Sequence, residues 1–268
     1  LLSPEDLRTR LEAETEPRVT FSFYRYAHIT EPEVLRDQYY KQWRKLDVFG
    51  RVYIATEGIN GQVSVPTSNF EVFKALLYAV DFMDGMRINI GIEAEAESFL
   101  KLKIKVRPKI VADGLEDETF DVTKRGRHLN ATQVNELLDH SETIVVDMRN
   151  HYESEVGHFK NAITPDVETF RASLPIINEQ LKDFKETKNL VMYCTGGIRC
   201  EKASAYYKHH GFKNVYQLEG GIINYAKQIQ EEGLESKFIG KNFVFDNRLG
   251  ERITDDIVSQ CHQCGKPC

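Results

Sequence analysis

The chain lacks a long hydrophobic run, and none of its 268 residues belongs to a stretch approaching the ~18 apolar residues of a membrane-spanning helix. Its opening segment, LLSPEDLRTRLEAETEPR, is charged throughout, which is unlike a signal peptide. Internal repeats and low-complexity tracts are missing too. We therefore expect a cytoplasmic protein with no membrane partner, long enough for two domains of about 100–200 residues each.

An excess of basic residues is missing as well. The net charge is −6 and the isoelectric point is near 5.8, which argues against a surface that binds nucleic acid everywhere but allows a local basic strip. Cysteines are few and odd in number; the five are Cys194, Cys200, Cys261, Cys264 and Cys268. This distribution does not fit a disulfide framework and predicts reactive or metal-binding thiols in a reducing compartment.

The first part of the chain alternates between strand-like and helix-like segments. Residues rich in β-branched and aromatic side chains predict strands, and apolar residues at helical spacing predict helices. The predicted strands are 18–29, 50–65, 86–92 and 99–111, and the predicted helices are 31–47 and 68–81. This order is close to βαββαβ and predicts a ferredoxin-like (split βαβ) α+β domain over residues 1–112, followed by a polar linker over 113–127.

The second part, residues 128–235, has a different pattern. Continuous apolar strands alternate with amphipathic helices, which predicts a parallel α/β sheet covered on both faces. The strands are expected at 142–148, 189–194 and the start of 214–229, and the helices at 131–140, 174–184, 200–211 and the end of 214–229. Residues 236–268 form a short Cys-rich C-terminal extension with a strand-like segment, NFVFD.

A thiol follows one of the buried strands of this second part. Ligands bind at the carboxyl ends of strands in parallel sheets, and Cys194 lies at such an end. The segment that follows is expected to be an active-site loop that precedes a helix; its residues are Thr195, Gly196, Gly197, Ile198 and Arg199. The glycines let backbone N–H groups converge and the arginine adds a positive charge, so the thiol pKa should lie well below ~8.5.

The length of this loop separates two kinds of chemistry. Cysteine phosphatases place five residues between the cysteine and the arginine, whereas four residues separate Cys194 from Arg199. A shorter ring of N–H groups suits the single outer sulfur of a persulfide better than a phosphate. The loop therefore argues against a phosphatase.

Three motifs in the second part resemble single-domain rhodanese modules. They are CTGGIR (194–199), VVDMRNHYESEVGHFKNAI (145–163) and YQLEGGIINY (216–225), the last with Tyr225 where tryptophan is usual. The resemblance covers about 100 residues. It implies a rhodanese-like domain in which Asp147 and Arg149, at the end of a strand, orient the loop or a substrate, and in which His158 fixes a turn.

Motifs along nearly the whole chain resemble the rhodanese-containing tRNA uridine hydroxylase family. They are YRY (24–26), ATEGINGQVSV (55–65), KLKIKVRPKIV (101–111), GRHLNA (126–131), CTGGIRCEKASAY (194–206) and FVFDNR (243–248). The resemblance implies an oxidoreductase that uses molecular oxygen to hydroxylate the wobble uridine of tRNA to 5-hydroxyuridine, with Cys194 as the essential cysteine and tRNA as the partner.

The chemistry of Cys194 stays open between two versions. Its thiolate could add to C6 of uracil and make C5 nucleophilic toward an oxygen species, or it could carry an oxidised or persulfide sulfur. The sequence has no recognisable flavin, haem or non-haem iron site. The alternative function is a thiosulfate-type sulfurtransferase that carries a persulfide on Cys194, and a third is a tRNA-binding protein without activity.

A basic strand, a second thiol and a terminal cysteine cluster complete the candidate sites. Lysines and arginines alternate with apolar residues in KLKIKVRPK, so this strand either contacts tRNA phosphates or is a solvated edge strand protected by its charges. Cys200 either resolves an oxidised Cys194 or simply begins a helix. The terminal cysteines suggest an incomplete site for structural zinc. The basic residues are Lys101, Lys103, Lys105, Arg107 and Lys109, and the terminal cysteines are Cys261, Cys264 and Cys268.

Overall fold

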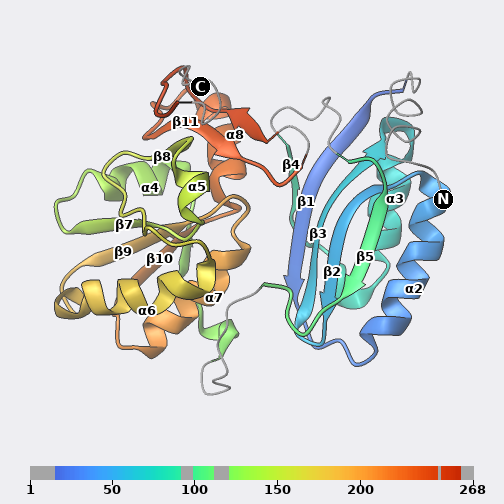
Figure 1. The fold of residues 1–268 in the computed structure, drawn as a ribbon, viewed down its shortest axis with the longest axis horizontal. Coiled ribbons are helices and arrows are strands. Elements are labelled where there is room, and N and C mark those ends of the chain that lie inside the picture. The colour runs from blue at the N-terminus through green and yellow to red at the C-terminus, as the bar shows by residue number, and fades with distance from the viewer. Residues whose placement is uncertain (1–15, 92–98, 112–120, 247–248, 261–268) are drawn as a thin grey trace. The chain divides into compact units, whose positions relative to one another are not determined.

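The computed structural model describes residues 16–91, 99–111, 121–246 and 249–260. The chain divides into two compact units (Figure 1). The first unit runs to Val111 and takes in the segment 245–249, and the second unit contains the remaining residues. Within the described ranges, no helix has the length and apolar character needed to cross a membrane.

The first unit is a five-stranded sheet with two helices on one face. Its strands run in the order β4-β1-β3-β2-β5, antiparallel except for β5, which is parallel to β2. The first four strands follow the predicted split βαβ order, and β5 extends the sheet at the β2 edge. The elements are β1 (Arg18–Tyr26), α2 (Pro32–Trp43), β2 (Phe49–Ala55), β3 (Gly58–Pro66), α3 (Phe70–Tyr78), β4 (Ile88–Ile90) and β5 (Leu102–Val106).

The segment 50–65, expected as strand, is two strands joined by a tight turn. Ala55 pairs with Gly58, so only Thr56 and Glu57 connect β2 to β3. Neither residue is the asparagine or glycine that marks such turns in a sequence. Both glycines of EGING, Gly58 and Gly61, therefore belong to β3. Gly61 is required by packing, because a Cβ there would lie 2.5 Å from the ring of Phe23.

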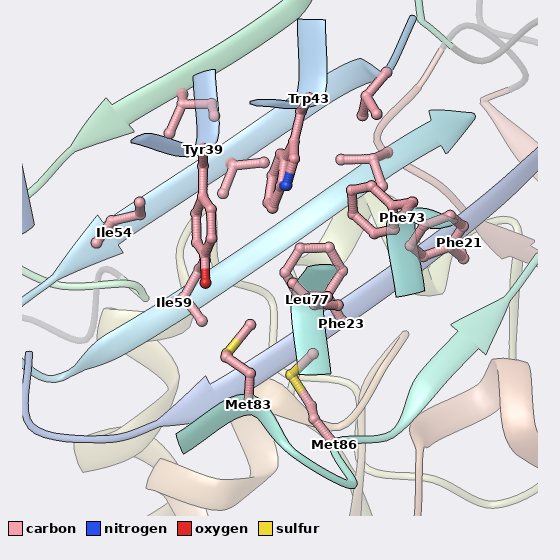
Figure 2. Packing of buried hydrophobic residues seen from close by; sticks show 14 of the residues in the cluster. Phe21, Phe23, Tyr39, Trp43, Ile54, Ile59, Phe73, Leu77, Met83 and Met86 are labelled. Atoms are coloured by element: carbon pink, nitrogen blue, oxygen red, sulfur yellow. The ribbon is translucent and has the colours of Figure 1, made fainter. Parts of the chain in front are cut away.

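The core of the first unit lies between the sheet and its two helices. Tyr39 and Trp43 from α2 and Phe73 from α3 pack onto sheet residues such as Phe23 and Ile59 (Figure 2). All five side chains are 1% exposed or less. The opposite face of this sheet is the one that α2 and α3 leave uncovered.

The second unit contains a parallel sheet with the strand order β6-β10-β9-β7. Helices α4 and α8 lie on one side of this sheet and α6 and α7 on the other (Figure 1), as the apolar strands predict. The elements are β6 (Arg127–Leu129), α4 (Ala131–Leu138), β7 (Thr143–Asp147), α5 (His151–Ser154), α6 (Phe170–Gln180), β9 (Asn189–Tyr193), α7 (Ile198–His209), β10 (Asn214–Leu218) and α8 (Gly221–Glu232).

A small antiparallel sheet of the order β12-β11-β8 completes this unit. It consists of β8 (Gly157–Phe159), β11 (Phe238–Phe243) and β12 (Gly250–Arg252). The strand expected at NFVFD thus ends at Phe243 and begins earlier. His158, expected in a turn, lies on β8, where Ser154 O and the ring nitrogen Nδ1 are 2.9 Å apart. Short 3-10 helices occupy Arg44–Leu46, Thr67–Asn69, Asp81–Met83, Val122–Lys124 and Lys182–Phe184.

Candidate active site

Cys194 follows the last residue of β9 at the carboxyl end of the parallel sheet, and its side chain is fully buried. Gly197, with φ 98°, is the N-cap of α7, so the helix starts at Ile198. Ile198 and Arg199, expected in the loop, therefore form the first turn of the helix. The N–H of Gly197 donates to Cys194 Sγ at 3.1 Å, and the N–H groups of Arg199 and Cys200 also donate to this sulfur.

The start of α8 packs against the backbone of this loop. The N–H groups of Ile222 and Ile223 donate to the carbonyls of Cys194 and Thr195 at 3.0 and 3.2 Å. Gly221 has φ +66°, and a Cβ on it would lie 2.5 Å from both carbonyl oxygens. The glycines of the LEGG motif thus let α8 approach closely enough to fix the loop.

Arg199 is held by a buried carboxylate that sequence reasoning did not single out as a site residue. Glu153, on α5, accepts from Arg199 Nη1 at 2.6 Å and from Nη2 at 2.9 Å. It is fully buried, and the N–H of Asn150 and the hydroxyl of Thr195 also donate to it. Burial would raise the pKa of Glu153, but the Arg199 charge and hydrogen bonds, with help from Arg149, keep this pKa below its ordinary value.

Opposing effects set the ionisation of the Cys194 thiol. Burial alone would raise its pKa, but the hydrogen bond with the Cys200 side chain, the Arg199 charge and the N–H groups of Cys200 and Arg199 lower the pKa to about 6. The pKa of Cys200 is raised well above its ordinary value by burial and by its hydrogen bond with Cys194. Cys200 is therefore a thiol beside a thiolate, and it is both a helix residue and a neighbour of the nucleophile.

Asp147 and Arg149 form a buried ion pair at the carboxyl end of β7. Arg149 donates to Asp147 at 2.6–3.1 Å and to the carbonyl of Gly157 at 2.6 Å, and both side chains are 1% exposed or less. The structure thus places both side chains in the interior, where they tie the end of β7 to β8. Together with Glu153, Arg199 and Cys194 they form a chain of alternating charges.

The basic strand belongs to the other unit. Lys103 and Lys105 are exposed on β5, and Ile104 between them is buried. This is the alternation expected from the sequence. β5 is also the outer strand of its sheet. Its position therefore fits the alternative interpretation, in which the lysines protect an edge strand. Lys101 and Arg107 are exposed on either side of the strand, and Lys109 is half-buried.

Cys261, Cys264 and Cys268 lie outside the described residues, so the zinc site stays a prediction. Within the part of the chain that the structure describes, no group of three or more His, Cys, Asp or Glu side chains is arranged to hold a metal ion.

We expect the Cys194 thiol to titrate near pH 6. At a pKa of about 6, about 90% of this thiol is ionised at pH 7, whereas an ordinary thiol is mostly protonated there. Because the side chain is buried, the thiolate is best followed by its ultraviolet absorbance, which needs no reagent. Subtracting the titration of Cys194→Ser from that of the wild type isolates this group among the five thiols. A difference curve centred near the ordinary value of 9.0 would contradict the geometry described above.

Three family models match the chain. An UPF0176 acylphosphatase-like domain matches residues 18–110, a rhodanese-like domain matches 130–228, and a rhodanese C-terminal segment matches 239–268. They confirm the predicted fold class, in which a ferredoxin-like domain precedes a rhodanese domain and a C-terminal segment.

Curated relatives match the chain over its full length. A protein named tRNA uridine(34) hydroxylase from Photorhabdus laumondii is 58% identical over 268 residues, which are 100% of this chain and 76% of the relative. A protein of the same name from Pectobacterium carotovorum is 56% identical and is covered to 75%. Among solved structures, a single-domain sulfurtransferase from Saccharomyces cerevisiae matches 42% of this chain and 98% of its own at 21% identity, with a TM-score of 0.33.

The family resemblance seen in the motifs is therefore confirmed over the full length of the chain. At this identity and coverage, the chain belongs to the tRNA uridine(34) hydroxylase family.

Proposed function

We propose that this protein is a cytoplasmic enzyme that hydroxylates uridine 34, the wobble uridine, of tRNA. The name shared by full-length relatives at 56–58% identity carries this proposal. The product is 5-hydroxyuridine, the oxygen atom comes from molecular oxygen, and the enzyme is thus an oxidoreductase. The buried thiol loop supports an enzyme over a passive tRNA-binding protein, because a thiol pKa of about 6 serves nucleophilic chemistry.

Cys194 is the nucleophile in this proposal. Its thiolate adds to C6 of uracil, which is electron-poor, and the electron pair moves to C5 and O4 as an enolate. The enolate carbon C5 forms a bond to an electrophilic oxygen, and loss of the C5 proton with release of the thiolate restores the ring. The N–H groups around the sulfur stabilise the thiolate before addition and after release.

The stoichiometry of the overall reaction shows which co-reactants the enzyme needs. Replacing the C5–H by C5–OH with O2 consumes two electrons and two protons and releases the second oxygen atom as water. The proposal therefore includes a two-electron reductant.

Arg199, held in place by Glu153, keeps a fixed positive charge beside the sulfur, and Thr195 links Arg199 and Glu153 through its hydroxyl. These groups position the nucleophile.

Isotope labelling tests the proposed reaction. Cells lacking this protein are complemented with the wild type and grown under heavy-isotope-labelled dioxygen, and tRNA nucleosides are analysed by mass spectrometry. We expect 5-hydroxyuridine to return carrying one heavy oxygen atom. Product that returns with unlabelled oxygen would reject dioxygen as the source, and no product at all would reject the hydroxylase proposal.

Sulfur transfer from the same loop is the second candidate. The N–H groups that converge on Cys194 Sγ also suit a persulfide, whose outer sulfur carries the negative charge. In that case thiosulfate transfers its outer sulfur to Cys194 and releases sulfite, and cyanide removes that sulfur as thiocyanate. Rapid thiocyanate formation by the purified protein, with no 5-hydroxyuridine formed in cells, would favour this candidate.

A further inference from the structure

The face of the first sheet opposite its helices carries aromatic, amide and basic side chains. Phe21, Phe23, Val52 and Ile54 point to the helix-covered side and belong to its core. Since side chains alternate along a strand, the residues between them point to the other side. From β1, β2 and β3 these are Ser22, Tyr24, Tyr26, Arg51, Tyr53, Asn60 and Gln62.

The register brings these residues into rows across the sheet. Tyr24 pairs with Asn60, Asn60 pairs with Tyr53, and Tyr53 pairs with Lys105. In the next row Ser22 pairs with Gln62, Gln62 with Arg51, and Arg51 with Lys103. Each row thus runs from polar or aromatic side chains in the middle of the sheet to a cation at its edge. We call this set, Tyr24, Arg51, Tyr53, Asn60, Gln62, Lys103 and Lys105, the tyrosine face.

All charged residues in the strands of this sheet are basic. The five strands contain no acidic residue, and their charged residues are Arg18, Arg25, Arg51, Lys103 and Lys105. The chain as a whole has a net charge of −6, so composition does not explain this concentration of cations. The guanidinium of Arg107 adds a further charge 5.8 Å from the centre of the Tyr53 ring.

Burial limits the tyrosine face to one part of the sheet. Thr20, Ser64 and Asn89 also point to this side, but each is 5% exposed or less. Tyr24, Tyr53 and Asn60 are half-buried, and Arg51, Lys103 and Lys105 are exposed. Their rings and charged groups therefore reach the surface.

Protection of an edge strand does not explain this arrangement. Lysines on an outer strand discourage sheet pairing, and that accounts for Lys103 and Lys105. It does not account for Arg51 and Tyr53 on β2, or for Tyr24 on β1, because both are inner strands of the sheet. A ladder of aromatic rings and amides bordered by cations matches what unpaired nucleotides need: a stacking surface, hydrogen-bond partners for base edges, and positive charge for phosphates.

We propose that the tyrosine face binds unpaired nucleotides of the tRNA substrate, with bases stacked on Tyr24 and Tyr53 and phosphates on Arg51, Lys103 and Lys105. This inference rests on the proposed function for the identity of the RNA, and it adds the place where single-stranded RNA is held. Asn60, between Tyr24 and Tyr53, and Gln62, beside Arg51, hydrogen-bond the edges of the stacked bases.

Binding of fluorescein-labelled heptauridylate to the full chain, followed by fluorescence anisotropy, tests the proposal without any turnover. Loss of one stacking contact is worth about 1–3 kcal/mol, so Tyr53→Ala should weaken binding by about 5- to 150-fold. Tyr53→Phe keeps the ring and should restore most of the affinity. Lys105→Gln should lower the slope of log affinity against log salt by about 0.7.

Two matched controls come from α2, on the other side of the sheet. Tyr40 is 41% exposed there, and Lys41 is exposed beside it. Tyr40→Ala and Lys41→Gln should bind heptauridylate as the wild type does. Equal affinities for Tyr53→Ala, Tyr24→Ala and Tyr40→Ala would overturn the proposal, and so would an absence of heptauridylate binding by the wild type.

A second measurement needs no variant and thus does not depend on folding of the mutants. Heptauridylate containing 4-thiouridine is photo-crosslinked to the wild type, and the modified peptides are mapped. Crosslinks in the peptides of β1 and β2 support the tyrosine face, and crosslinks confined to the second unit overturn it. Binding at this face without hydroxylation in cells would reject the proposed function alone, whereas hydroxylation that is unaffected by Tyr24→Ala and Tyr53→Ala would reject this inference alone.

Discussion

Replacing Cys194 with serine is expected to abolish formation of 5-hydroxyuridine while leaving the protein folded. A serine hydroxyl is not ionised near neutral pH, so the loop would hold no nucleophile, and removal of a catalytic nucleophile in other enzymes costs about 10⁴- to 10⁶-fold. The smaller oxygen fits the same buried position, which the N–H of Gly197 and the start of α8 define. The effect should therefore appear in the rate rather than in stability.

The measurement is single-turnover hydroxylation of tRNA, with thermal unfolding followed in parallel. Cys200→Ser is the informative comparison, because it keeps the nucleophile and replaces one donor to Cys194 with another. It should retain measurable activity, with the pKa of Cys194 displaced from about 6. Full activity of Cys194→Ser would remove this thiol from the mechanism. Equal loss of activity in both variants would show that the pair of thiols, and not one of them, performs the reaction.

Local patterns made the thiol loop and the basic strand predictable. The loop is contiguous, so a cysteine at a strand end followed by Gly196 and Gly197 already specifies converging N–H groups. The alternation in KLKIKV likewise specifies one exposed and one buried side, as Lys103 and Ile104 show. The turn between β2 and β3 carries no such signal, because Thr56 and Glu57 are not typical turn residues.

The partner of Arg199 was hidden by its distance along the chain. Glu153 lies 46 residues away. In the sequence it is visible only as a residue inside the motif 145–163 and as part of a capping box with Asn150. That pattern indicates the start of a helix and says nothing of a buried ion pair. β8 was missed for a related reason: it has only three residues and is held by pairing with β11, nearly 80 residues further along the chain.

Replacing Glu153 with glutamine is expected to cause the largest loss of stability. Glutamine has the same shape but leaves the guanidinium of Arg199, whose side chain is 11% exposed, without its anionic partner. Removing one member of a buried ion pair typically costs about 3–5 kcal/mol. Glu179→Gln is the matched control, because Glu179 accepts from Lys182 at the same 2.6 Å but both side chains are more than half exposed. It should have little measurable effect.

The position of the only tryptophan makes the measurement specific. Trp43 lies in the core of the first unit, so its fluorescence reports on that unit, whereas circular dichroism reports on both. In urea, Glu153→Gln should lower the midpoint seen by circular dichroism more than the midpoint seen by fluorescence. Arg199→Gln in the same chain should recover part of the loss, since it removes the unpaired charge.

The loss of stability caused by Glu153→Gln should depend on pH. Because Arg199 holds the pKa of Glu153 below its ordinary value of 4.5, the carboxylate contributes stability above that pH, and this contribution is lost as the pH falls through the lowered pKa. The difference in stability between wild type and Glu153→Gln should therefore be constant near neutral pH and shrink in acid. The same variant should lower the pKa of Cys194 further, because the charge of Arg199 is no longer offset by Glu153. A difference that stays constant into acid, or a rise in the Cys194 pKa, would mean that Glu153 supports the loop by its shape and not by its charge.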